Sequence, residues 1–233
     1  MPQNKFISFQ IRDAQKAMLE MADGAIDAMN KQMKKAVRKS SYLEEAREIA
    51  AIALVFSPEV QGLFDSSPEG LASQIGFPAG TAVTYVEAIT DEVANSVEME
   101  YFYSKGKAAL TINVQPSNYA NLFALAEATI PVSSRRNGSY ELEWLDWLLL
   151  QGDRIIVQDF YYDPDSAPKG RSGGGTMKAV SPAAGPGQLN IGAWRIPPEY
   201  IGIDDDNFIT RSLQSKDTVN KYAKLLQKMV KGT

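Results

Sequence analysis

The chain has 233 residues, of which 44% are hydrophobic and 22% are charged, so it can bury the core of one large domain or two small ones. It contains no cysteine and no histidine. Their absence excludes disulfides, thiolate nucleophiles, Ser-His-Asp triads and metal sites built on Cys or His ligands. Any catalysis would rely on carboxylates, lysine or tyrosine, and we expect a protein that is not an enzyme and binds no metal or cofactor.

The net charge of −4 is spread unevenly along the chain. Residues 41–100 contain eleven Asp and Glu against a single basic residue, Arg47. Two short segments are basic: residues 31–39 hold five Lys and Arg, and residues 216–231 hold five Lys against Asp217. This segregation predicts surfaces of opposite charge that meet between subunits, with solvated helix faces as the alternative. The cations that we expect to face DNA are Lys31, Lys34, Lys35 and Arg38.

No part of the sequence has the character of a membrane or targeting segment. Residues 1–15 lack the continuous apolar region of a signal peptide. The longest apolar run, near residues 50–56, is too short to cross a bilayer. We therefore expect no contact with a membrane.

Residues 1–95 are predicted to be mainly helical. A short strand or extended arm over residues 6–11 precedes a long helix that begins near Arg12, because apolar residues recur there at helical spacing. The residues on that apolar face are Met18, Ala22, Ile26, Met29, Met33 and Val37. The methionines indicate core packing, with an adaptable subunit interface as the alternative.

Further helices are predicted from their capping residues. The capping box Ser41–Glu44 begins a helix that extends to about Phe56. Ser57-Pro58-Glu59 and Ser67-Pro68-Glu69 each place an N-cap, a first-turn proline and an acid at the start of a short helix. Another helix is predicted over residues 80–92. The residues expected to face inward on it are Val83, Val86 and Ile89 or Ala88.

The second part of the chain begins with a predicted hairpin. Residues 97–103 and 110–114 alternate apolar and polar side chains around a turn at residues 104–107, which is the pattern of two paired strands. Ser117 is expected to cap a helix over residues 118–128.

The elements that follow surround a long loop. After a turn at residues 136–139, an apolar helix is predicted over residues 142–149 and a strand over residues 155–160. Residues 163–187 are rich in Gly, Pro, Ser and Ala. We expect a flexible loop there, with one strand near residues 176–180.

A final amphipathic helix is predicted over residues 217–231. Together the elements predict an α+β fold, in which a long N-terminal helix and a helical subdomain pack on a small antiparallel sheet. We expect a mainly helical region over residues 1–95 and an α+β region over residues 96–233, which together form one integrated domain.

Several local patterns are typical of chemistry but have simpler explanations. Residues 170–178 are Gly-rich but lack the Gly-Lys-Ser/Thr ending of a phosphate-binding loop. Asp204–Asn207 offers oxygen ligands without EF-hand spacing, which favours a turn. Trp144 and Trp147 are expected to be core anchors rather than binding residues. Three acidic pairs lie near predicted helix ends, where acids are common, and a hydrolase built on them is an open alternative. The pairs are Glu44/Glu45, Asp91/Glu92 and Glu141/Glu143.

The C-terminal third of the chain carries a series of motifs in a fixed order. They are Trp144-Leu-Asp-Trp147-Leu-Leu-Leu-Gln-Gly-Asp153, Gly170-Arg-Ser-Gly-Gly-Gly-Thr-Met177, Trp194-Arg-Ile-Pro-Pro198 and Asn207-Phe-Ile-Thr-Arg211. With Ser57-Pro-Glu-Val-Gln-Gly62 and Ile75-Gly-Phe-Pro78, this series resembles the neck, tail-completion and minor-tail virion proteins of tailed bacteriophages. Ala167-Pro-Lys-Gly-Arg-Ser172 is similar to the flexible loop of that group.

The resemblance implies a structural protein of the phage head–tail junction (neck, tail completion or tail terminator). It implies a homo-oligomeric ring, a hexamer or dodecamer, around the DNA channel, in which one patch meets a different patch of the next copy. The implied partners are other neck, portal-adaptor, tail-tube or sheath proteins and, without sequence specificity, channel DNA.

The resemblance also implies a location in the virion, after assembly in the bacterial host cytoplasm, and it transfers no catalytic residues. A carboxylate-dependent cell-wall hydrolase and a DNA-packaging accessory factor are the alternative functions. The residues expected at the interfaces between subunits are Lys169, Arg171, Ser172, Met177, Trp194, Arg195, Phe208 and Arg211.

Overall fold

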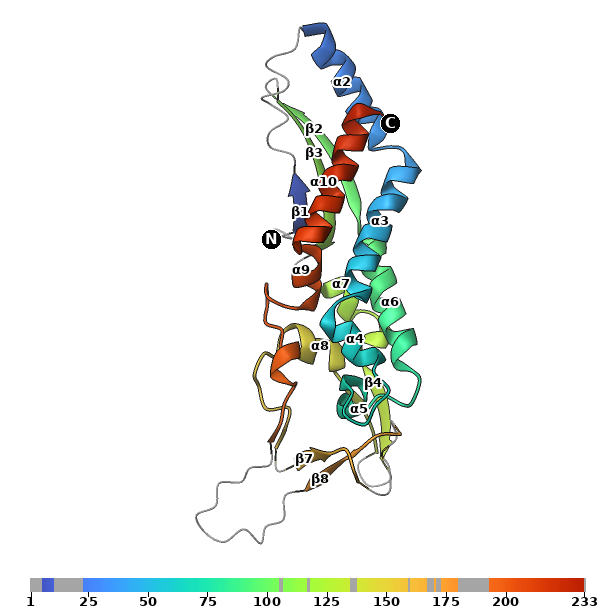
Figure 1. Cartoon of the computed structure of the whole chain (residues 1–233), viewed down its shortest axis with the longest axis vertical. Helices are drawn as coiled ribbons and strands as arrows, with labels where there is room; N and C mark the ends of the chain where they lie inside the picture. Colours follow the sequence, from blue (N-terminus) through green and yellow to red (C-terminus); the bar gives the residue numbers. More distant parts are fainter. Residues whose placement is uncertain are drawn as a thin grey trace. The chain divides into compact units, whose positions relative to one another are not determined.

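The computed structural model of the chain is α+β, as expected, and consists of helices with small antiparallel sheets (Figure 1). It contains two compact units: unit 1 is residues 1–54, 90–121 and 210–233, and unit 2 is residues 55–89 and 122–209. The chain therefore passes four times between the units, and neither unit coincides with the expected regions 1–95 and 96–233. The structure describes residues 6–10, 23–104, 107–116, 118–134, 138–158, 160–166, 170, 173–179 and 193–232.

Unit 1 contains a three-stranded antiparallel sheet with the strand order β1-β3-β2. The predicted hairpin is confirmed as β2 (Glu98–Ser104) and β3 (Lys107–Pro116), with Ser104 opposite Lys107. The predicted N-terminal strand is confirmed as β1 (Phe6–Gln10), which pairs with the other edge of β3. Every residue of β3 from 110 to 115 is buried, as suits a central strand that is covered on both faces.

The helices of unit 1 bury one stripe each. In α3 (Ser40–Val55) every fourth residue is buried, and the last helix, α10 (Lys216–Lys231), has the expected apolar face. The buried residues are Tyr42, Ala46, Ala50 and Leu54 on α3, and Thr218, Tyr222, Leu225, Leu226 and Met229 on α10. The Tyr222 hydroxyl donates a hydrogen bond of 3.1 Å to the Ala46 carbonyl, which ties the two helices together.

The long N-terminal helix is described from residue 23, as α2 (Asp23–Ala36), which contacts α10 (Figure 1). Met33 is buried on its inner face, and the expected start of this helix near Arg12 lies outside the described residues. Helix α3 begins at Ser40, so Ser41 occupies the first turn and is not the N-cap of the predicted capping box.

The predicted helix over residues 118–128 is wrong in extent. It is split into α7 (Ala120–Phe123) and the 3-10 turn η1 (Ala126–Ala128). The break lies at Leu125, whose extended backbone (φ −75°, ψ 142°) cannot continue a helix. Ser117, the expected cap, lies outside the described residues.

Unit 2 is made of short elements. Its described helices include α4 (Pro58–Phe64), α5 (Leu71–Ile75), α8 (Trp144–Leu149), the 3-10 turns η1 and η2 (Pro198–Tyr200) and the unit 2 residues of α6 (Ala82–Asn95), α7 and α9 (Phe208–Leu213). The α8 prediction is confirmed, although Leu142 belongs to a strand. Trp144 is the expected core anchor: it is buried, its ring meets Phe77 edge-on at 5.2 Å, and its indole N–H donates 2.7 Å to the Glu127 carbonyl.

Two expectations about capping have different outcomes. Ser57 caps α4 as predicted, because its hydroxyl accepts a hydrogen bond of 3.2 Å from the Val60 amide. Ser67 does not begin a helix. Its amide instead donates 2.9 Å to the Asp65 carboxylate, and the chain turns before α5 begins after Gly70.

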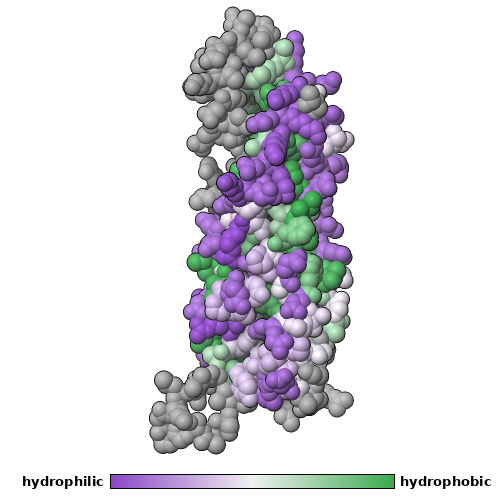
Figure 2. Space-filling view, viewed as in Figure 1, coloured by the Kyte–Doolittle hydropathy of each residue, from purple (hydrophilic) through white to green (hydrophobic). Residues whose placement is uncertain are grey.

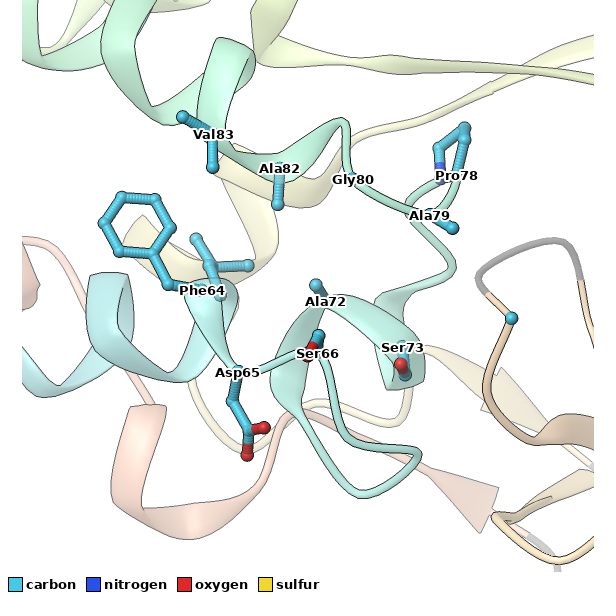
Figure 3. A pocket seen from close by; sticks show the side chains of 12 residues that line it. Phe64, Asp65, Ser66, Ala72, Ser73, Pro78, Ala79, Gly80, Ala82 and Val83 are labelled. Atoms are coloured by element: carbon cyan, nitrogen blue, oxygen red, sulfur yellow. The ribbon is translucent and has the colours of Figure 1, made fainter.

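Helix α6 also differs in one inward residue. Val86 and Ile89 are buried as predicted, whereas Val83 is 46% exposed. Val83 lies in the first turn of α6, at the rim of a small pocket (Figure 3), where the described elements leave it open to solvent.

The described residues of unit 2 also form three two-stranded antiparallel sheets. They pair β4 (Ile130–Ser134) with β5 (Gly138–Leu142), β6 (Val157–Gln158) with β9 (Ala193–Trp194), and β7 (Phe160–Asp163) with β8 (Thr176–Ala179). The β8 strand confirms the strand expected inside the long loop. Strands β4 and β5 were not predicted, since only a turn was expected at residues 136–139.

Candidate functional site

The glycine-rich motif forms a packed turn at its described positions. The amide of Gly170 donates 3.2 Å to the carbonyl of Gly174, and the amide of Gly175 donates 2.8 Å to the hydroxyl of Tyr162. A Cβ on Gly175 would lie 2.2 Å from the Asp163 carbonyl oxygen, and one on Gly174 would lie 2.7 Å from the side chain of Ser73. Close approach, and not flexibility, therefore requires glycine at these two buried positions.

Tyr162 connects this turn to the segment before α5. Its hydroxyl donates to the Pro68 carbonyl while it accepts from Gly175, so the side chain bridges two segments of unit 2. Burial raises the pKa of Tyr162 above its ordinary value, because the phenolate would lose hydration. The neutral hydroxyl is the form that can both donate and accept.

An apolar groove of about 480 Å³ lies beside the turn in unit 2. We define the apolar groove by residues from β4, β5, α8, β6, β7 and β8, namely Val132, Tyr140, Leu142, Trp147, Val157, Phe160, Tyr162 and Met177, together with residues of α5 and the glycine turn. Tyr140 and Phe160 are 45% and 38% exposed, although both are aromatic. The groove thus presents aromatic side chains from two separate two-stranded sheets.

A second, smaller hollow of about 310 Å³ lies between α4, α5 and the start of α6. Figure 3 shows Phe64 and Val83 on one side of it and the small residues Ala72 and Ala79 on another. Gly80 completes the rim with a left-handed backbone (φ +75°). Its lining is mostly small and apolar, and it contains no arrangement of acid, base and nucleophile.

The basic segment of unit 1 is exposed. We define the basic surface as Lys31, Lys34, Lys35, Arg38 and Lys39, all of which have exposed side chains. It borders a hollow of about 390 Å³ that is lined by Gln32, Lys35, Ala36, Arg38, Lys39, Tyr42 and Gly232. The four cations expected to face DNA therefore share one surface. Figure 2 shows hydrophilic colour over much of the region of α2 and α10.

The residues expected at subunit interfaces have different positions. Met177 lines the apolar groove, and Arg195 is exposed and forms an ion pair with Asp153. Trp194 and Phe208 are buried in the chain, with exposed fractions of 7% and 3%, so most of each side chain is not available to a neighbouring subunit. Arg211 is exposed in α9. Lys169, Arg171 and Ser172 lie outside the described residues.

The acidic pairs have structural partners. Glu45 pairs with Lys228 at 2.6 Å, Glu92 accepts 2.9 Å from the Asn121 amide, and Glu141 accepts 3.1 Å from the Thr129 hydroxyl. The Asp204–Asn207 segment forms a tight turn, as predicted, in which the Asn207 side chain donates 2.6 Å to the Asp204 carbonyl.

Within the described ranges, no group of three or more Asp or Glu is placed to hold a metal ion. Along the same stretches, no helix combines the length and the apolar character needed to span a bilayer.

The apolar groove was missed at the level of sequence. Tyr140 and Phe160 lie in strands of four or five residues, too short for a periodic signal. Tyr162 was missed for the same reason, although aromatic residues next to a glycine-rich run are a usable signal for close packing.

Comparison of the chain with protein-family models, with curated proteins and with solved structures gives no match.

Proposed function

We propose that the chain is a structural virion protein of the phage head–tail junction, which assembles into a homo-oligomeric ring around the DNA channel. The motif series from Trp144 to Arg211 supports the choice of family. The observation that carries self-assembly is the apolar groove of unit 2, which lies open between two-stranded sheets.

The groove has the properties of an incomplete interface. An isolated pair of strands is marginally stable in water, and its free edges can pair with another chain. In the described part of unit 2, each sheet has only two strands, and two of these sheets, β4–β5 and β7–β8, carry exposed aromatic side chains. A strand or side chain from a neighbouring copy would cover the groove and complete the sheet.

The charges of the two units favour a second copy as the neighbour. Unit 1 carries 17 Lys and Arg against 12 Asp and Glu, a net charge of +5, and unit 2 carries 7 against 16, a net charge of −9. Unit 2 of one copy and unit 1 of the next therefore attract each other. Contact between different patches on identical copies closes into a ring when the rotation fits.

The test is the mass of the native assembly. Native mass spectrometry of the full chain should give a hexamer or dodecamer. The double variant Tyr140→Ser/Phe160→Ser, which removes aromatic side chains from the groove, should shift the mass toward the monomer. The control is Phe56→Ser/Tyr161→Ser, which removes the same two side-chain types from exposed positions of unit 2 that do not line the groove and should leave the ring intact.

Two results would overturn the proposal. One is a wild-type chain that is strictly monomeric and absent from purified phage particles. The other is an equal loss of assembly in both double variants, which would remove the apolar groove as the interface.

A further inference from the structure

We infer that the basic surface of unit 1 binds the phosphate backbone of duplex DNA, with one phosphate group seated in the hollow between α2, α3 and the end of α10. The inference takes its partner from the proposed function, which places the chain around DNA, and it adds a defined contact surface.

The basic surface places five cations within residues 31–39. Among the described residues, no carboxylate lies within ion-pair distance of any of them. Elsewhere in unit 1, lysines do find carboxylates: Lys221 pairs with Asp217 and Lys228 with Glu45, both at 2.6 Å. The positive charge of the basic surface is therefore not neutralised by the described carboxylates and can attract an anionic partner.

The charged residues that line the hollow are all positive. Three of its lining residues are the cations Lys35, Arg38 and Lys39, and none of the described lining residues is acidic. Its volume of about 390 Å³ is within the range of small-ligand sites, roughly 300–1,000 Å³. An anionic group is the chemistry that such a lining favours.

Two features hold the hollow in shape. The Lys39 ammonium lies 4.6 Å from the centroid of the buried Tyr42 ring, a cation–π contact that restrains its position. Gly232 ends α10 with a left-handed backbone (φ +76°), and a Cβ there would lie 2.7 Å from the side chain of Gln32. The end of α10 is thus packed closely against α2.

A purely structural explanation is that these cations compensate helix dipoles. Lys34 and Lys35 in the last turn of α2, and Lys228 and Lys231 in the last turn of α10, do suit the negative ends of their helices. Dipole compensation accounts for one or two cations at each end. It does not account for Arg38 and Lys39, which follow the helix and line the hollow.

The arrangement suits a polyanion better than a single ion. Lys31, Lys34 and Lys35 are three and four residues apart, so they share one face of α2, and Arg38 and Lys39 extend the row into the turn. From residue 31 to residue 38 a helix would advance roughly 10 Å, which is long enough to meet several phosphates of one DNA strand. Contacts of this type position a duplex without reading its sequence.

The negative charge of unit 2 also favours binding of DNA to unit 1. Its net charge of −9 repels DNA, whereas unit 1 has a net charge of +5. A duplex is therefore steered to the basic unit although the whole chain is acidic.

The experiment is a fluorescence-anisotropy titration of a labelled duplex of about 30 base pairs, at salt concentrations from ~50 to ~200 mM. The test variant is Lys35→Gln/Arg38→Gln. The control is Lys216→Gln/Lys224→Gln, which removes the same charge from exposed positions on α10 that do not line the hollow. The test variant should lose about ten-fold in affinity and lower the slope of log K against log salt by about 2, roughly 0.9 for each lost contact. The control should lose less than about two-fold.

Several outcomes would overturn the inference: equal losses in the two variants, binding that does not depend on salt, or no binding of DNA by the wild-type chain. Binding to phosphatidylserine vesicles without binding to DNA would likewise reassign the surface. A second pair, Lys31→Gln/Lys34→Gln, should give a smaller loss than Lys35→Gln/Arg38→Gln, because its residues do not line the hollow. All these side chains are exposed, and an unchanged thermal midpoint checks that each variant folds.

This measurement is independent of the ring. A monomer that binds DNA through the basic surface would refute the proposed assembly and support the contact. A ring that does not bind DNA would support the proposed assembly and refute the DNA contact.

Discussion

The two units of this chain reach stability by different means. In the described residues, unit 1 combines helices of up to 16 residues with a central strand of 10 residues, and buried residues recur along α3, α10 and this strand. The described part of unit 2 contains helices of seven residues or fewer, apart from its share of α6, and sheets of two short strands. Its core depends on single contacts, such as Gly175 against Asp163 and the Trp144 hydrogen bond. Where buried residues repeat along an element, one substitution removes a small part of the stability. Where the core depends on a single contact, one substitution removes a large part of it.

The largest expected effect is at the glycine turn of unit 2. Gly175→Ala should lower the free energy of unfolding by about 3 kcal/mol, because the new Cβ meets backbone that cannot move aside. Gly80→Ala is the control in the same unit. Its glycine also lies beside a hollow, but a Cβ there has no atom within 4 Å, so only the backbone at φ +75° costs about 1 kcal/mol. Chemical denaturation measures both, and equal losses would contradict the role of close approach.

A smaller difference should separate the two buried tryptophans of unit 2. Trp144→Phe and Trp194→Phe remove the same atoms, but only the Trp144 indole N–H has an acceptor, since that of Trp194 is buried with no partner among the described residues. Trp144→Phe should therefore be more destabilising by about 1 kcal/mol. Urea unfolding of both variants checks this, and a larger loss in Trp194→Phe would show that its N–H is bonded.

The hydrogen bond from Tyr222 to Ala46 in unit 1 should affect stability at alkaline pH. Burial raises the pKa of Tyr222 well above its ordinary value, which is about 10 in an unfolded chain. Burial of the neutral hydroxyl contributes its full stability at pH values below the pKa of the unfolded chain. This contribution is lost as the pH rises above that pKa. Tyr222→Phe should cost about 1 kcal/mol at neutral pH and should make the fall in stability above pH ~10 shallower.

Thermal unfolding measured from neutral pH upward tests this prediction. Some slope should remain in the variant, because burial also raises the pKa of Tyr101, Tyr162 and Tyr200. An unchanged slope would mean that the Tyr222 hydroxyl is not buried in solution.

The smallest expected effect on stability comes from removing an exposed ion pair, and it should be the same in both units. Lys178 pairs with Asp163 in unit 2 and Lys228 with Glu45 in unit 1, and each lysine side chain is 44% exposed. The hydrogen bond to the carboxylate raises the pKa of each lysine. Exposed pairs contribute little and are screened by salt. Lys178→Gln and Lys228→Gln should barely shift the midpoint of thermal unfolding, and a large shift in one alone would reveal a further difference between the units.

Sequence reasoning succeeded where patterns were long. The apolar face of α10, the β2–β3 hairpin and the Ser57 cap are confirmed, because each is set by residues close together in the chain. The basic surface was found in the same way, from five cations within one short segment.

Sequence reasoning failed where distant segments decide the outcome. Val83 has the spacing of an inward residue, but its exposure depends on which segments cover the first turn of α6. Trp194 and Phe208 were expected at an interface because of their motifs, and tertiary packing buries them. The apolar groove collects side chains from many short elements, so no local pattern could have predicted it.

The interleaving of the units has a consequence for synthesis on the ribosome. Unit 2 is complete in sequence once residue 209 has been made, but unit 1 needs both residues 1–54 and residues 210–233. Until α10 emerges, the buried face of α3 has no Tyr222 to meet it, and a nascent chain with exposed apolar surface is prone to aggregate. A copy that terminates before residue 210 therefore cannot complete the fold of unit 1.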